Sequence, residues 1–181
     1  MLRTLIPHSD QPTPAGLEVA VDCSRAGSGR LALTWRASGI DQVRWPEPAA
    51  PARRDGLWEH TCFEAFVRPG EGPGYLEFNL SPSGAWAAYR FDDYRAGMAP
   101  APVDAPRAVA ARPEGVFELS AMLDLSGLPG VADRPWSVGV SAVIEALDGA
   151  KSYWALSHPP GKADFHHADC FGLTFPARHL A

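Results

Sequence analysis

The sequence has few cysteines, no excess of basic residues and no long apolar run, and each absence excludes a class of protein. Three cysteines among 181 residues are too few for a disulfide framework, so we expect reduced thiols. A net charge of -5 argues against nucleic acid as a partner. There is no run of about eighteen apolar residues and no signal-peptide core, which predicts a cytoplasmic protein that does not bind membranes.

Familiar catalytic motifs are absent as well. The sequence contains no Gly-x-Ser-x-Gly nucleophile motif, phosphate loop, dinucleotide fingerprint or His-Glu-x-x-His zinc motif. His60 and Cys62 would lie on one side of an extended strand, as a base and its nucleophile would, but no third group that orients them is evident. A buried structural thiol is the better interpretation of Cys62, and we favour a protein without catalytic activity.

Turns and short alternating segments dominate the chain. Glycine (17 residues) and proline (18 residues) are abundant, and two proline-rich stretches, residues 44–54 and 99–106, are expected to form loops. One helical turn is expected at residues 123–128. Alternating or aromatic-rich segments favour β-strands at residues 17–23, 31–35, 62–68, 75–81, 85–91, 116–122, 136–144, 152–156 and 171–175. This pattern predicts an all-β fold: one antiparallel β-sandwich domain over residues 1–181, immunoglobulin-like or jelly-roll-like.

Polar side chains on the segment 75–81 indicate that one face of its predicted sheet binds a ligand. Alternate side chains of a strand point to opposite faces. Glu77 and Asn79 should therefore face away from the core, which their apolar neighbours Leu76, Phe78 and Leu80 would contact. Glu64 on the preceding segment alternates with apolar residues in the same way, so we expect it beside Glu77.

A turn at residues 81–84 sets the expected partners of these side chains. A four-residue hairpin loop there places Asn79 opposite Trp86 and brings Arg90 to the same face. Trp58, at the border of the first proline-rich loop, could reach a ligand on this face. A polyhydroxylated ligand would be bound by hydrogen bonds and ring stacking from Glu64, Glu77, Asn79, Trp86, Arg90 and Trp58. Alternatively, the face is merely solvated, with a Glu77–Arg90 ion pair that Trp86 partly covers.

Two regions of the chain resemble the DOMON-like superfamily and the related family-nine carbohydrate-binding modules. The first runs from Leu57 to Val67 and continues in the pattern Tyr-x-Glu-Phe-x-x-x-Pro-x-Gly at residues 75–84. The second comprises Tyr-Trp-Ala-Leu-Ser at residues 153–157 and the Phe-His and Phe-Gly pairs of residues 164–172. The resemblance implies two antiparallel sheets and a module that binds sugars or haem, usually without catalysis.

The same resemblance raises the question of haem. Haem-binding members use a methionine with a histidine or lysine as axial ligands, which would implicate Met98 with His158 or His166. Sugar-binding relatives carry a similar histidine, so His166 is interpreted first as structural. No cofactor is therefore predicted, and haem stays an alternative.

The histidines and aspartates of residues 158–169 also invite a metal. His166 and His167 are adjacent and would point apart on an extended segment, so we predict no metal site. The leading hypothesis is a non-catalytic module that binds a saccharide or similar small polar ligand on one sheet face. The alternatives are a haem or redox carrier, a metal-dependent enzyme and a protein-interaction domain.

Overall fold

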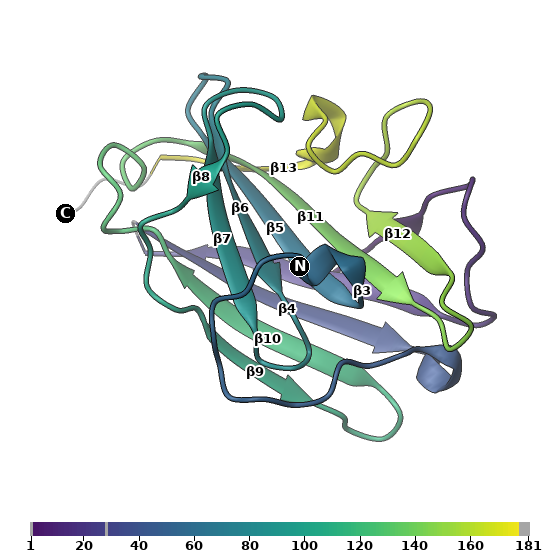
Figure 1. The fold of residues 1–181 in the computed structure, drawn as a ribbon. Coiled ribbons are helices and arrows are strands. Elements are labelled where there is room, and N and C mark those ends of the chain that lie inside the picture. Colours follow the sequence, from purple (N-terminus) through teal and green to yellow (C-terminus); the bar gives the residue numbers. More distant parts are fainter. Residues whose placement is uncertain (1, 28, 178–181) are drawn as a thin grey trace.

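Two antiparallel sheets face each other in the computed structural model, which describes residues 2–27 and 29–177 (Figure 1). The smaller sheet has the strand order β1 (Leu2–Thr4), β3 (Glu18–Ala26), β4 (Arg30–Ser38), β10 (Phe117–Asp124) and β9 (Arg107–Ala111). The larger sheet has the order β2 (Ile6–Pro7), β12 (Lys151–Ala155), β11 (Trp136–Glu145), β5 (Cys62–Pro69), β6 (Tyr75–Leu80), β7 (Trp86–Phe91) and β8 (Ala99–Pro100), and β13 (Leu173–Phe175) also pairs with β11. This architecture confirms the predicted all-β sandwich.

Helical structure in the described residues is limited to three short 3-10 turns: η1 (Ile40–Gln42), η2 (Leu57–Glu59) and η3 (Ala168–Cys170). The helical turn expected at residues 123–128 is wrong, because β10 continues to Asp124 and a tight turn follows. The Asp124 carboxylate forms this turn by accepting a hydrogen bond from the backbone N–H of Ser126 (3.0 Å). Along the described residues, no helix is long and apolar enough to span a membrane.

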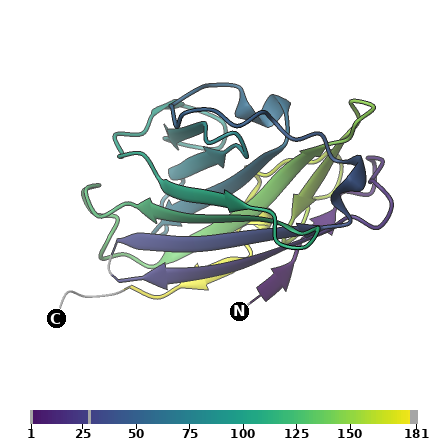
Figure 2. The ribbon, with the colours of Figure 1, turned by 90° about the horizontal axis from the view of Figure 1, so that it is seen from below.

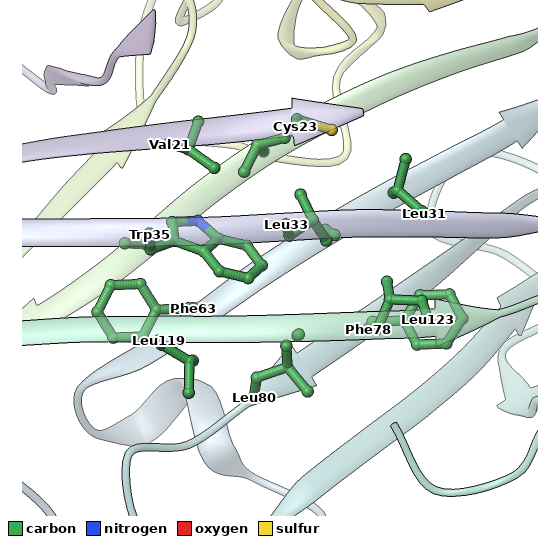
Figure 3. Close-up of a cluster of buried hydrophobic side chains, with 14 of the residues drawn as sticks. Val21, Cys23, Leu31, Leu33, Trp35, Phe63, Phe78, Leu80, Leu119 and Leu123 are labelled. Carbon is green, nitrogen blue, oxygen red and sulfur yellow. The ribbon is translucent and has the colours of Figure 1, made fainter. Parts of the chain in front are cut away.

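The hydrophobic core lies between the two sheets, whose strands run at an angle to each other (Figure 2). Figure 3 shows that side chains of the smaller sheet, such as Leu33 and Trp35, meet side chains of the larger sheet, such as Phe63 and Phe78. Phe63 is fully buried, and its ring stacks on Phe117 with the ring centres 5.5 Å apart. Burial of one such side chain stabilises the fold by roughly 1.5–3 kcal/mol.

A second apolar cluster lies on the opposite, outer face of the larger sheet. Its buried members include Phe66, Tyr75, Phe91, Val143 and Phe165. An outer sheet face of a sandwich is normally solvated, as the alternation of polar and apolar residues in β3 and β10 illustrates. In β5 and β6 nearly every residue is buried instead, so something must cover the outer face of these strands.

Candidate functional site

The turn between β6 and β7 decides which side chains share the outer face. Leu80 pairs with Trp86, so Ala85 belongs to the turn and the loop has one residue more than expected. A shift of one residue moves every side chain of a strand to the other face. The prediction that Trp86 and Arg90 share the face of Glu77 and Asn79 is therefore wrong.

Both of these side chains have other partners. Trp86 packs into the core between the sheets and is 8% exposed, and the Arg53 guanidinium lies 4.5 Å from the centre of its ring. Arg90 is exposed and pairs with Asp92 (3.0 Å), so the alternative of an ion pair with Glu77 is also wrong. On the outer face β7 contributes Ala87, Tyr89 and Phe91.

The other three predicted residues of the sheet do share the outer face. Glu64 on β5 is the cross-strand partner of Asn79 on β6, and Phe66 is the partner of Glu77. On its other side Glu64 pairs with Ser141 of β11. Glu64 and Glu77 are 3% and 5% exposed, which is unusual for carboxyl groups.

Segments distant in the sequence bury these carboxyl groups. The segment between β12 and β13 and the loop after β7 both lie at the upper end of the larger sheet in Figure 1. The first carries His166, whose ring contacts the rings of Phe66 and Phe91 with centres 5.2 Å apart in each pair. The second carries Arg95, whose guanidinium pairs with Asp164 of the first segment (2.7 Å). This ion pair ties the two segments together over the sheet.

A cavity of about 420 Å³, the outer pocket, is left between the sheet and these segments. Its volume lies in the range of roughly 300–1,000 Å³ that is typical of small-molecule sites. Polar groups and aromatic rings line it together: Trp58, Glu59, Glu64, Glu77, Phe91, Arg95, Met98, Val143, Lys151, Tyr153, Ala163, Phe165 and His166. The outer pocket therefore offers hydrogen-bonding groups and apolar ring surface to one ligand.

The two buried carboxyls make the floor of the outer pocket unusual electrostatically. Burial raises the pKa of Glu64 well above its ordinary value, and the neighbouring Glu77 carboxyl adds to the rise. Burial raises the pKa of Glu77 as well, although a hydrogen bond from the Asn79 amide (2.6 Å) opposes the rise. The Ser141 hydroxyl is 3.4 Å from Glu64. The pair therefore keeps its proton to a higher pH than exposed glutamates do, and a carboxyl group that keeps its proton offers a hydroxyl donor.

His166 links this floor to the covering segments. Its Nδ1 forms a hydrogen bond with the Tyr75 hydroxyl (2.7 Å), and its Nε2 is 3.8 Å from a Glu77 oxygen. Burial, together with the positive charge of Arg95, lowers the pKa of His166 to about 4. The imidazole is therefore neutral near pH 7, and its interpretation as a structural residue agrees with its packing among rings.

Trp58 forms one wall of the outer pocket. It lies in η2 and is 39% exposed. Its ring meets the Tyr89 ring edge to face, with centres 6.1 Å apart, and the Tyr89 hydroxyl donates a hydrogen bond to Asp55 (2.5 Å). An exposed indole that is held in place is a suitable surface for a sugar ring to stack on.

The haem ligands considered from the sequence do not all line one cavity. Met98 and His166 line the outer pocket, whereas Nε2 of His158 is 2.8 Å from the backbone oxygen of Ile6. An axial ligand needs a ring nitrogen free to bind iron. Both nitrogens of His166 already face protein groups, Tyr75 and Glu77, so this arrangement does not fit an axial histidine. Within residues 2–27 and 29–177, no cluster of three or more His, Cys, Asp or Glu residues could hold a metal ion.

Sequence reasoning missed several residues of the outer pocket. Arg95 lies in an exposed loop, and only its contact with Asp164, 69 positions further along the chain, places it at the site. Lys151 and Tyr153 lie on β12, which pairs with β11 rather than with the β5–β7 block. The signal that could have found Tyr153 is alternation, since it is the cross-strand partner of the outward Val143.

Comparisons with known proteins bear on the fold. No family model matches the sequence, and the comparison with curated proteins found no match. A candidate carbohydrate-binding protein from Bacteroides uniformis ATCC 8492 has a similar structure (TM-score 0.68, 15% identity, covering 97% of this chain and 85% of that one). A family-nine carbohydrate-binding module from Caldicellulosiruptor kristjanssonii, solved in complex with glucose, is also similar (TM-score 0.52, 9% identity, covering 99% and 86%). At these identities the likeness shows the fold alone.

Proposed function

We propose that this protein is a saccharide-binding module and that the outer pocket is its binding site. The observation that carries the proposal is the buried carboxyl pair, Glu64 and Glu77, on the floor of a cavity with aromatic walls. Sugars present hydroxyl groups at the ring edge and apolar C–H groups on the ring faces. A site for them therefore needs both kinds of surface at once.

Each group of the outer pocket has a role in this proposal. Glu77 accepts hydrogen bonds from sugar hydroxyls, and the proton held by the carboxyl pair allows Glu64 to donate one. Arg95 lines the outer pocket and is held there by Asp164 through Nε and one terminal nitrogen, so its guanidinium can meet a second hydroxyl. Trp58 and Tyr153 supply ring surface. The fold shared with a candidate carbohydrate-binding protein and with a family-nine module bound to glucose supports the same class of ligand.

Isothermal titration with glucose, mannose, galactose and xylose tests the proposal. We expect at least one of them to bind, and the Glu77→Gln variant to bind it about tenfold more weakly or worse. A hydrogen bond to a charged group contributes about 1.5–3 kcal/mol, and 1.4 kcal/mol corresponds to a factor of ten. Trp58→Ala is expected to weaken binding by a similar factor through the loss of ring contact.

The matched control is Glu118→Gln, which removes a carboxylate on β10, away from the outer pocket, where Glu118 pairs with Arg36 (2.8 Å). Its sugar affinity should equal that of the wild type. Thermal melts of all variants show whether any loss of affinity is a loss of fold. Wild-type affinity in a folded Glu77→Gln protein, or no binding of any of the four sugars, contradicts the proposal.

A further inference from the structure

A second cavity adjoins the outer pocket on the far side of Trp58. It has a volume of about 710 Å³ and lies between the first proline-rich loop and the turn that joins β6 to β7. Arg54, His60 and Ser83 are among its lining residues. Trp58 and Glu59 line both cavities, so the two spaces meet at these side chains. We call the second space the loop groove.

Backbone hydrogen bonds build the walls of the loop groove. The backbone N–H of Ala49 donates to the oxygen of Ser83 (2.8 Å), that of Trp86 to Ala52 (3.0 Å), and that of Arg54 to Trp86 (2.9 Å). The proline-rich loop is thus fastened to the β6–β7 hairpin at three points. Proline also restricts the backbone of the loop. The groove is therefore formed before any ligand arrives, which lowers the entropy cost of binding there.

The shared wall is also fixed in position. Gly56 precedes η2 with a φ of 74°, a left-handed conformation that glycine adopts without strain, and it turns the chain so that Trp58 enters the wall. The hydrogen bond between Tyr89 and Asp55 anchors the loop on the groove side of this indole. A half-exposed tryptophan between two cavities offers ring surface to a ligand that extends through both.

The loop groove also contains an unused hydrogen-bond donor. The exposed Arg54 guanidinium has no hydrogen-bond or ion-pair partner among residues 2–27 and 29–177, although its backbone is held by Trp86. Glu47 and Glu59 supply carboxylate acceptors to the same groove. The loop groove thus combines charged groups with the shared Trp58, as the outer pocket does.

We propose that the ligand is an oligosaccharide with one sugar unit in the outer pocket and the next in the loop groove, passing over Trp58. This inference rests on the proposed function and extends it from a single sugar to a chain. A monosaccharide bound in the outer pocket would leave the loop groove, of about 710 Å³, to water. The second unit adds contacts with Arg54 and with the groove side of Trp58.

Titration with the dimers and trimers of glucose, mannose, galactose and xylose, in α-1,4 and β-1,4 linkage, tests this inference. We expect the dimer of the sugar that binds best to bind about tenfold more tightly than its monomer, a gain equivalent to about 1.4 kcal/mol. The readout is the ratio of monomer Kd to dimer Kd. Arg54→Ala should lower this ratio, and the contact with Trp58 accounts for the gain that is left. Arg107→Ala, which removes an exposed arginine on β9, is the matched control and should keep the wild-type ratio.

The outcomes separate the two proposals. Equal affinity for monomer, dimer and trimer overturns the extended site but leaves saccharide binding in the outer pocket intact. A tenfold gain that Arg54→Ala does not reduce also overturns the role of the loop groove. The absence of binding by all four monosaccharides contradicts the proposed function itself.

Discussion

The buried carboxyl pair predicts a pH-dependent stability that the Glu64→Gln variant should remove in part. Glu64 is 3% exposed, and both burial and Glu77 raise its pKa. In the unfolded chain a glutamate has a pKa of roughly 4.3. Above that pH the unfolded chain has lost the proton while the folded protein still holds it, so stability must fall as the pH rises.

The size of this effect follows from linkage. One additional proton bound by the folded state changes the free energy of unfolding by about 1.4 kcal/mol per pH unit. If the folded protein keeps the proton from pH 5 to 7, the wild type loses about 2.7 kcal/mol over that interval. This is a large part of a typical stability of about 5–15 kcal/mol. The amide group that replaces the carboxyl group in the variant cannot ionise, so the stability of the variant should fall much less.

Urea unfolding of the wild type and of Glu64→Gln at pH 4, 5, 6, 7 and 8 measures this difference. At pH 4 both side chains are neutral and the two proteins should have similar stability. From pH 5 upward the variant should gain steadily on the wild type. The lowered pKa of His166 acts with the opposite sign, since it costs stability as the pH falls below the ordinary pKa of histidine, but it is present in both proteins and largely cancels. A difference that stays constant across the series refutes the reasoning.

Two further predictions concern haem and the backbone. Hemin added to the purified protein should give no sharp low-spin Soret band, because both ring nitrogens of His166 face protein groups, and a stoichiometric band that Met98→Ala abolishes would contradict this. Gly39→Ala should lower the free energy of unfolding by more than about 1 kcal/mol, because Gly39 has a φ of 67° and an added Cβ would lie 1.9 Å from the backbone oxygen of Gly16. Gly115→Ala is the control, because Gly115 has a φ of 78° but nothing within 4 Å of the added Cβ. The difference between the two variants therefore measures the cost of the steric clash. Equal losses of unfolding free energy in both would show that the clash contributes nothing.

The sequence was sufficient to predict the sandwich and the face of the carboxyl pair. Both follow from alternation of side chains along strands. On β5 and β6 this alternation places Glu64 and Glu77 on one side of the sheet, whatever the rest of the chain does. The strand β9 escaped prediction because its residues are exposed and lack a periodic apolar pattern.

The errors at the site also have a physical cause. The sequence Ser-Pro-Ser-Gly at residues 81–84 is compatible with a loop of four residues and with a loop of five that includes Ala85. The choice between the two loops reverses the face on which Trp86 lies. Arg95 reaches the site through its contact with Asp164, and His166 through its contact with Tyr75 of β6. These tertiary contacts leave no trace in local spacing. Local patterns therefore identified the floor of the outer pocket but not its covering segments.

The most direct test of the central claim is amide and indole chemical-shift mapping by NMR with the best-binding saccharide. Saccharide binding in the outer pocket predicts that the largest shifts fall on the Trp58 indole N–H and on the amides of Glu77, Arg95, Tyr153 and His166, whose residues line it. The outer pocket is not the site if the largest shifts fall instead on β3, β4 and β10 of the smaller sheet while the pocket residues keep their free-state positions.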